Sequence, residues 1–230
     1  MENNKNLHIV NGSKGGVGKS FVCMALLDYL TQHDDKKITL IESDTSNPDV
    51  AKAYAKDNMV EVISLRLDDA DGWIELVNIC DNTGNDIVVN SAARSNDAVA
   101  EYGVTLTESL EELQRNAISY WVINRQRDSI ELLKKYEQHM NGTIHVVRNT
   151  YYGDAKKFEL YNSSVTAKHL ESRGKTLNFP DLADRVADDL YSKRLSIVRA
   201  IDELPIGNRA ELKRWRKLAW EMFGGALQHE

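Results

Sequence analysis

Apolar runs and helical patterns alternate along most of the chain. The runs that we expect to form strands are residues 7–10, 36–44, 59–67, 86–91, 118–124, 143–149 and 175–179. Helical patterns cover residues 21–33, 72–82, 107–115 (with Thr107 as a plausible N-cap) and 129–140, and they continue from residue 181 onward. This alternation is typical of a parallel sheet covered by helices on both faces. It predicts one three-layer α/β/α domain over residues 1–230, with a mostly parallel central sheet and a helical C-terminus.

The last helical pattern, over residues 207–224, is amphipathic and basic. Helical spacing places an apolar set on one face, namely Leu212, Trp215, Leu218, Ala219, Met222 and Phe223. The other face carries Trp220 together with four basic residues, Arg209, Lys213, Arg216 and Lys217. This pattern fits a helix docked on the sheet, a helix that contacts nucleic-acid phosphates, or a membrane-surface anchor. The membrane surface is the less favoured partner, because a few basic residues at about 1 kcal/mol each attract anionic lipid only weakly.

Composition places the chain among ordinary globular proteins. Apolar residues make up 42% and charged residues 28% of the 230 positions, so neither a disordered nor a membrane protein is indicated. The first five residues lack the apolar segment of a signal peptide, and no apolar run approaches a bilayer span. We therefore expect a cytoplasmic location. Cys23 and Cys80 lack CxxC spacing and fall in separate helical patterns, so we interpret both as reduced, packed thiols.

Charge is distributed unevenly between the two halves of the chain. Residues 1–115 contain 10 Lys and Arg against 20 Asp and Glu, a net charge of −10. Residues 116–230 contain 19 against 15, a net charge of +4. An anionic partner, such as DNA bound without sequence preference, is therefore expected on the basic C-terminal half.

A glycine-rich loop, residues 11–20, joins the first strand to the first helix and carries the clearest chemical signal. Glycines let the backbone approach an anion closely, while the loop amides and the helix N-terminus direct positive charge toward it. In such a loop Lys19 reaches the terminal phosphates of a nucleotide, and the Ser20 hydroxyl suits Mg²⁺. The strict pattern asks for glycine at position 13, where this chain has serine. Strand, loop and helix together predict a phosphate-binding P-loop.

The loop is more specific than the general pattern, because Lys14 places a second lysine at its start. In this respect residues 14–20 resemble the deviant Walker A ATPases of the ParA/MinD type, of the SIMIBI class. The resemblance implies ATP or ADP with Mg²⁺ as ligands and a homodimer that forms around ATP, in which Lys14 acts catalytically on the partner's nucleotide. By the same resemblance, the cofactor-binding residues of the loop are Ser13, Lys14, Gly15, Gly16, Val17, Gly18, Lys19, Ser20 and Phe21.

Two acidic residues end the second predicted strand, where ligands of open α/β sheets bind. Ile41-Glu42-Ser43-Asp44 resembles the second motif of the same family, an acid, any residue and a second acid. The resemblance implies that Asp44 is catalytic and lies near the attacking water and, through water, near Mg²⁺, with Glu42 in the place of the earlier acid. Asp44 could also cap a turn, because Asp-Thr-Ser-Asn-Pro is a good turn sequence. The two roles are compatible.

The end of the fourth predicted strand departs from the family. Where the family pattern has an aspartate that holds a Mg²⁺-bound water, this chain has Asn90. An amide oxygen holds that water more weakly than a carboxylate does. Asp86 cannot replace it, because four residues at about 3.3 Å each place it about 13 Å from the strand end. Either Asp44 takes more of this role or hydrolysis is slow, and we predict nucleotide binding with weak intrinsic turnover.

Base recognition is placed by resemblance only. Residues 145–149 resemble the family strand that ends in an asparagine facing the adenine, which makes Asn149 the candidate for that contact. Asn124, at the end of the preceding strand, is a second candidate, although asparagine at a strand end is often only a turn residue. Residues 179–182, which include Pro180, resemble the later loop whose backbone lies along the base.

The sequence therefore predicts an ATP-binding dimerisation switch of the ParA/MinD type that hydrolyses ATP slowly and serves plasmid or DNA segregation or positioning. The resemblance also implies a partner protein that stimulates turnover. One alternative is a non-hydrolysing regulatory or scaffold protein that binds nucleotide and recruits a partner, and another is a MinD-like membrane-associated ATPase. A metabolic enzyme with the same loop, such as an amide-forming synthetase or a kinase, would need a further substrate site, which the sequence does not reveal.

Overall fold

The computed structural model describes residues 5–93 and 95–227, so residues 1–4 of the N-terminal segment considered above lie outside the described part. Seven parallel strands form one sheet in the order β3-β2-β4-β1-β5-β6-β7. Their bounds are β1 (Lys5–Gly12), β2 (Ile38–Glu42), β3 (Val60–Ser64), β4 (Asp86–Asn90), β5 (Arg115–Ile123), β6 (Thr143–Asn149) and β7 (Thr176–Phe179). The predicted α/β fold is confirmed, and the described strands are parallel throughout.

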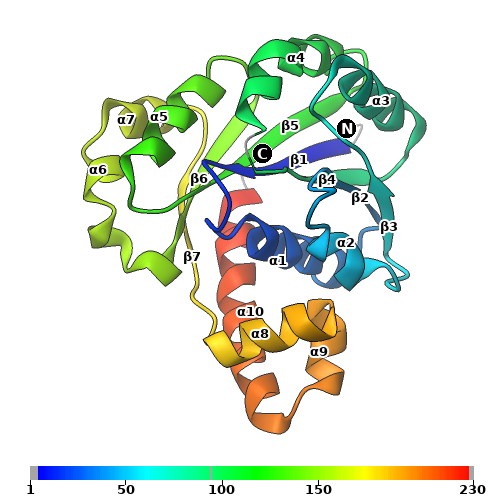
Figure 1. Cartoon of the computed structure of the whole chain (residues 1–230), viewed down its shortest axis with the longest axis vertical. Helices are drawn as coiled ribbons and strands as arrows, with labels where there is room; N and C mark the ends of the chain where they lie inside the picture. The colour runs from blue at the N-terminus through cyan, green and yellow to red at the C-terminus, as the bar shows by residue number, and fades with distance from the viewer. Residues whose placement is uncertain (1–4, 94, 228–230) are drawn as a thin grey trace.

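Helices cover both faces of the sheet, which gives three layers (Figure 1). One face carries α1 (Lys19–Gln32), α2 (Asp49–Tyr54), α8 (Asp184–Lys193), α9 (Ile197–Glu203) and α10 (Ile206–Leu227). The other carries α3 (Ala70–Asn82), α4 (Asn96–Ser109), α5 (Arg127–Tyr136), α6 (Glu159–Asn162) and α7 (Val165–Leu170). Two 3-10 turns follow β6, η1 (Thr150–Tyr152) and η2 (Ala155–Lys157). The predicted three-layer arrangement with a helical C-terminus is confirmed.

Two hydrophobic cores lie on opposite faces of the sheet, because its central strands are apolar on both sides. In β4, Val88 packs in the core with α1, whereas Ile87 and Val89 pack in the core with α3 and α4. Residues 22–30 of α1 are buried without a break, because α2, α9 and α10 cover the side of α1 that faces away from the sheet. This burial holds the N-terminus of α1, and with it the glycine-rich loop, against the strand ends.

The predicted helix at residues 107–115 is wrong in position. The helix in this region is α4, which ends at Ser109, and β5 already begins at Arg115. Between them Gln114 has a φ of 51°, and this left-handed backbone interrupts any helical path. The Arg115 guanidinium donates to three backbone carbonyl oxygens at and just after the C-terminal end of α3, over 2.7–3.0 Å. Arg115 therefore closes the end of one helix instead of belonging to another.

Short helices are the elements that the sequence pattern did not predict. α2, α6 and α7 have only four to six residues each, and these are too few to show a helical repeat. The helical region after residue 181 divides into α8, α9 and α10. α5 begins and ends earlier than the predicted range of 129–140.

The C-terminal helix α10, predicted over 207–224, is docked on the protein. Leu212, Trp215, Ala219 and Phe223 are each at most 1% exposed, in the core that α10 shares with α1 and β7. Leu218, predicted for the same face, is 40% exposed. Of the three interpretations of this helix, the docked one is observed. Within residues 5–93 and 95–227, the structure contains no helix with both the length and the apolar character needed to traverse a bilayer.

One residue of the predicted basic face, Arg216, joins a buried polar clamp between α10 and α1. Its Nε donates to Asp28 Oδ2 over 2.7 Å, and its guanidinium lies 4.3 Å from the centre of the Trp220 ring. The Trp220 indole donates to the same oxygen over 2.8 Å. Burial raises the pKa of the Asp28 carboxyl, and the neighbouring Arg216 opposes this shift. By contrast Lys217 is 80% exposed and pairs with Glu221 of its own helix.

Candidate functional site

A cavity of about 550 Å³ opens at the carboxyl ends of the strands, next to the glycine-rich loop. This volume is typical of pockets that bind small molecules and cofactors. The loop and the helix that follows contribute Gly15, Gly16, Gly18, Lys19, Ser20 and Phe21. The strand ends and the segments after them contribute Asp44, Asn90, Asn149, Phe179 and Pro180. Most of the predicted site residues therefore meet in one place, as the parallel sheet requires.

Two glycines give the loop its shape. Gly16 has a φ of 79°, and Gly18, which caps the N-terminus of α1, has a φ of 102°. Both values lie in the left-handed region, where residues with a side chain are strained. Ser13 is not in this region, so its backbone does not need the glycine that the strict pattern prescribes. Serine at position 13 is thus compatible with a phosphate-binding loop.

Lys19, which is predicted to bind phosphate, lies at the wall of the cavity. It is 8% exposed at the start of α1 and lines the cavity. In this structure its Nζ donates to the backbone oxygen of Lys14 over 3.1 Å, which folds the side chain back over the loop. Burial lowers the pKa of Lys19, and the nearby Asp44 carboxylate opposes that shift. A triphosphate in the cavity would supply further negative charge and favour the charged form of this lysine.

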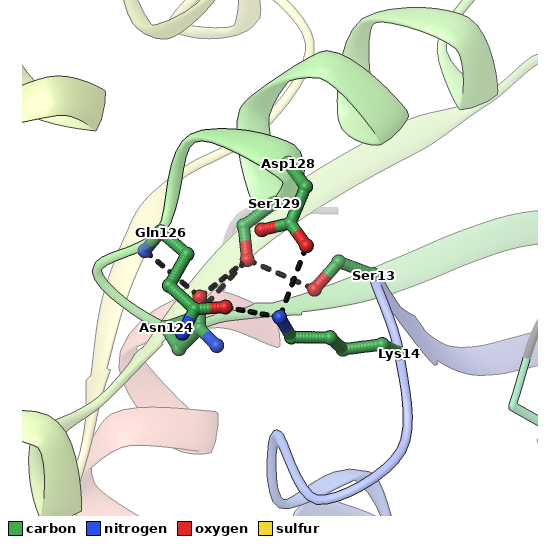
Figure 2. Close-up of polar contacts among 6 residues, drawn as sticks. All are labelled: Ser13, Lys14, Asn124, Gln126, Asp128 and Ser129. Carbon is green, nitrogen blue, oxygen red and sulfur yellow. Dashed lines mark hydrogen bonds and ion pairs between the residues drawn. The ribbon is translucent and has the colours of Figure 1, made fainter.

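Lys14, unlike Lys19, does not line the cavity. Figure 2 shows its side chain reaching the start of α5, where Nζ donates to Asp128 Oδ2 over 3.0 Å and to the side-chain oxygen of Gln126. The Lys14 side chain is 40% exposed and that of Asp128 is 47% exposed. The second lysine of the loop is therefore held at the surface, beside its own cavity.

Ser13 connects the glycine-rich loop to the start of α5. Its hydroxyl lies 2.9 Å from the Ser129 hydroxyl, which in turn donates to Asn124 Oδ1 over 2.7 Å (Figure 2). Asn124 Oδ1 also accepts the backbone N–H of Gln126 over 2.9 Å. Asn124 is thus a turn residue that organises the β5–α5 connection. It does not line the cavity, so the structure gives no support to Asn124 as a contact for the base.

Two acids lie at the carboxyl end of β2 and have different environments. Glu42 is the last residue of the strand, and Asp44 follows it. Asp44 lines the cavity, and its Oδ1 accepts the backbone N–H of Asn47 over 3.1 Å, so it also caps a turn as predicted. Glu42 is fully buried and accepts the backbone N–H groups of Asp44 and Ala51, each over 3.2 Å. Burial raises the pKa of Glu42 to about 7, although these hydrogen bonds and one from Asn90 act against the shift.

Asn90 ends β4 at the wall of the cavity and is 2% exposed. Its Nδ2 donates to Glu42 Oε1 over 2.8 Å. Its Oδ1 is buried and has no hydrogen-bond partner among the described residues. Asp86 lies at the opposite end of the same strand, where it pairs with Lys36 at 2.8 Å. The sequence prediction that Asp86 cannot serve this site is therefore confirmed.

The residues around the N-terminus of α1 fit a magnesium ion. Mg²⁺ prefers oxygen ligands and keeps several of its waters when bound. The cavity wall offers the Ser20 hydroxyl, the Asp44 carboxylate and the Asn90 amide, whose Oδ1 lacks a partner among the described residues. These groups would hold Mg²⁺ directly from Ser20 and through water from the other two. The ion would neutralise charge on the phosphates of a bound nucleotide.

Asn149 lines the cavity, but its side chain is engaged by the protein. Its Nδ2 donates to the backbone oxygen of Val17 over 2.9 Å, and its Oδ1 accepts the N–H of Tyr151 over 3.1 Å. In this state Asn149 links the end of β6 to the phosphate loop. The loop is held a second time by Tyr152, whose hydroxyl donates to the Gly16 oxygen over 2.6 Å. Pro180 lies at the same wall, after β7.

Aromatic residues from the C-terminal helices complete the cavity wall, and the sequence did not single them out for this site. Tyr191 of α8 and Trp215 of α10 line the cavity together with Phe21. The Phe21 ring meets the Tyr191 ring edge to face, with centroids 4.8 Å apart. No local motif marks these residues, because α8 and α10 meet α1 only in the folded chain. The apolar stripe of α10 was the one available signal, since it includes Trp215.

Known proteins are similar to this chain in sequence. Residues 8–159 match the family described as CobQ/CobB/MinD/ParA nucleotide binding domain. The protein named MobD of Acidithiobacillus ferrooxidans is 55% identical over 229 residues, which cover 98% of this chain and 99% of MobD. Similarity of this extent places the two chains in one family.

Solved structures share the fold at low sequence identity. A putative plasmid partition protein from Borrelia burgdorferi B31, bound to AMPPNP, superposes with a TM-score of 0.62 at 14% identity, covering 95% of this chain and 98% of that one. The MinD cell division protein of Aquifex aeolicus gives 0.57 at 16% identity, with 95% and 97% covered. These structures show the fold; the family match over residues 8–159 and the 55% identity to MobD show that the chain belongs to the CobQ/CobB/MinD/ParA family of nucleotide-binding domains.

Proposed function

We propose that this chain is an ATP-binding dimerisation switch in the cytoplasm that hydrolyses ATP slowly and serves the segregation or positioning of plasmid or other DNA. The observation that carries the proposal is the separation of the two loop lysines. Lys19 is buried in the cavity wall, whereas Lys14 is partly exposed beside the cavity. A lysine that does not serve its own cavity is free to reach the nucleotide of a second chain once its surface contacts break.

The nucleotide in this proposal is ATP with Mg²⁺. The shape of the loop, the buried Lys19 and the Ser20 hydroxyl support a triphosphate with its metal ion. The partition protein from Borrelia burgdorferi was solved with AMPPNP, an ATP analogue, which supports adenine as the base. Asn149 and the backbone near Pro180 would contact that base, and Asn149 would exchange one of its present hydrogen bonds to do so.

The test is the mass of the protein in solution with ADP and with a slowly hydrolysed ATP analogue. We expect a monomer with ADP and a dimer with the analogue. A protein that stays monomeric with both nucleotides at micromolar concentration would refute the switch. Steady-state ATP turnover, measured with and without duplex DNA and a candidate partner protein, would then test slow hydrolysis and its stimulation.

One observation favours a second candidate, a scaffold that binds nucleotide without hydrolysing it. Asn90 places a neutral amide on the cavity wall, where the family pattern has an aspartate, and it donates to Glu42. Such a site would hold ATP and change the surface offered to a partner without rapid turnover. Dimerisation with ATP that persists, with no phosphate released even in the presence of DNA and partner, would favour the scaffold.

DNA is the proposed surface partner, and a membrane is less favoured. The apolar face of α10 is buried in the protein, so it is not free to enter a bilayer interface. The exposed Lys213 and Lys217 and the positive charge of residues 116–230 support contact with DNA phosphates. Binding to duplex DNA that weakens with salt, and no sedimentation with anionic liposomes, is the expected pair of results.

A further inference from the structure

Glu42 and Asn90 are paired at the carboxyl ends of two neighbouring strands. They are register partners of β2 and β4, so their side chains lie on the same face of the sheet. Glu42 is fully buried and Asn90 is 2% exposed. The Asn90 Nδ2 donates to Glu42 Oε1 over 2.8 Å. Because the two polar atoms of an amide point in different directions, this bond turns the Asn90 Oδ1 away from Glu42.

The protein holds this pair rigidly. The Glu42 carboxylate accepts two backbone N–H groups, from Asp44 and Ala51, over 3.2 Å each. Ser43 joins the two strand ends, because its N–H and its hydroxyl both donate to the Asn90 backbone oxygen, over 3.0 and 3.1 Å. Glu42 cannot turn without breaking its hydrogen bonds to Asp44 and Ala51, and the Asn90 amide cannot turn without breaking its hydrogen bond to Glu42. The orientation of the Asn90 amide is therefore fixed by the fold.

The hydrogen bond to Glu42 uses the Asn90 Nδ2 and leaves the Asn90 Oδ1 available to another group. This oxygen is buried without a hydrogen-bond partner among residues 5–93 and 95–227, although Asn90 is part of the cavity wall that includes Ser20. A buried acceptor without a partner is unfavourable unless a bound group satisfies it. A water held by Mg²⁺ at the Ser20 hydroxyl is a donor of the required kind, and the negative charge of Glu42 directly behind the amide would favour the cation.

We propose that Glu42 is a positioning residue for the Mg²⁺ of the bound nucleotide, acting through Asn90. Glu42 supplies the carboxylate that the end of β4 lacks, and it directs the Asn90 Oδ1 to a Mg²⁺-bound water. One acid and one amide thus share the site across two strands, with the acid on β2 and the amide on β4. This inference rests on the proposed function, because it requires a bound nucleotide with its metal ion.

The test measures the affinity for a fluorescent ATP analogue in Mg²⁺ and in EDTA. The ratio of the affinity in Mg²⁺ to the affinity in EDTA reports the contribution of the metal ion to binding, and it requires no hydrolysis. Glu42→Gln keeps the acceptor for Asn90 and removes the charge, and we expect the ratio to fall at least about tenfold. Asn90→Ala, which leaves Glu42 in place, should give a similar loss. Ser20→Ala, which removes the direct ligand, sets the value expected when Mg²⁺ contributes nothing.

The double variant Glu42→Gln/Asn90→Asp moves the acid to β4 and the amide to β2, and can keep the hydrogen bond between them. We expect it to recover most of the wild-type ratio, which a merely structural role for Glu42 would not require. A normal wild-type ratio that Glu42→Gln and Asn90→Ala both leave unchanged would overturn this inference alone. Wild-type protein that binds no nucleotide in either buffer would overturn the proposed function and this inference with it.

Discussion

Lys14 and Asp128 form an ion pair of 3.0 Å within one chain, so the lysine that is proposed to reach a second chain already has a partner. Both side chains are partly exposed, at 40% and 47%, and such pairs contribute only about 0–1 kcal/mol. A contact of this strength can be exchanged for the phosphates of another chain's nucleotide. The ion pair is therefore weak enough to break when the dimer forms, which would free Lys14 for the nucleotide of the other chain.

Lys14→Ala should separate nucleotide binding from dimerisation. We expect the variant to bind ATP with nearly wild-type affinity, because Lys14 does not line its own cavity. We expect it to remain monomeric with a slowly hydrolysed analogue, because each chain then lacks the lysine offered to the other. Light scattering and a fluorescent-nucleotide titration measure the two properties. Lys19→Ala is the contrasting variant and should lose nucleotide affinity itself. A dimer of Lys14→Ala would contradict the role of this lysine.

Asp128→Asn should make dimerisation with ATP tighter, because it removes the charge that holds Lys14 in place. Two such pairs break in each dimer, so at about 0–1 kcal/mol per pair the dissociation constant should fall by no more than about 30-fold. Glu131→Gln is a matched control on the same helix, because Glu131 pairs with the exposed Arg127 and with no other cation among the described residues. If Asp128→Asn weakened the dimer instead, Asp128 would be a residue that aims Lys14 and not one that restrains it.

The phosphate loop could be predicted from the sequence because its chemistry is local. Gly16, Gly18, Lys19 and Ser20 act within five residues, and their strand-to-helix setting is visible in the apolar pattern. The partners of Lys14 could not be predicted in this way. Asp128 is 114 residues away, and only the pairing of β1 with β5 brings the loop beside α5. Long-range pairs of polar residues leave no periodic signal in a single sequence.

The same limit applies to Glu42 and Arg115. The sequence identified Glu42 as an acid next to Asp44 and Asn90 as a departure, but their hydrogen bond depends on β2 and β4 being neighbours in register. The helical pattern predicted over residues 107–115 includes Arg115. Its guanidinium instead binds carbonyl oxygens at the end of α3, a contact set by tertiary structure.

Gly18→Ala should abolish nucleotide binding. A Cβ at this position would lie 2.3 Å from Asn149 Nδ2, and the φ of 102° is already unfavourable for any residue with a side chain. The loop could accommodate the methyl group only by giving up the bond between Asn149 and Val17 and its left-handed turn. A fluorescent-ATP titration measures the loss. Gly225→Ala, in a helix with open space around the added carbon, should bind normally. Unchanged affinity in Gly18→Ala would mean that this loop does not hold the phosphates.

Glu42 should make the ligand-free protein less stable as the pH rises. The folded-state pKa of about 7 lies above the ordinary value of 4.5, so between these values the folded state binds the proton that the unfolded chain releases. The free energy of unfolding therefore falls as the pH rises from 4.5 through 7. At about 1.4 kcal/mol per pKa unit, the loss is of the order of 3 kcal/mol.

Urea unfolding in EDTA at pH 5 and pH 8 measures this effect. Glu42→Gln keeps one of the two acceptor oxygens and cannot ionise, so its stability should change less between the two pH values than that of the wild type. The difference between the two proteins isolates Glu42 from every other titrating group. Parallel pH dependences would show that the Glu42 carboxyl titrates at its ordinary value in the folded protein.

Arg216→Ala should destabilise the fold strongly, in contrast to its neighbour Lys217→Ala. Arg216 is the cation that faces Asp28, which is only 2% exposed, and removing one partner of a buried ion pair costs about 3–5 kcal/mol. Lys217 is 80% exposed, so its loss should change the free energy of unfolding by less than about 0.5 kcal/mol. Urea unfolding of the two variants measures the contrast.

The same two variants divide the basic face of α10 between structure and binding. If α10 contacts DNA phosphates, Lys217→Ala should weaken DNA binding and reduce its salt dependence while the protein stays as stable as the wild type. Arg216→Ala should affect DNA binding only through its loss of stability, because its guanidinium faces Asp28 and Trp220 within the protein. A stable Arg216→Ala with impaired DNA binding would contradict the buried clamp and would return Arg216 to the binding surface.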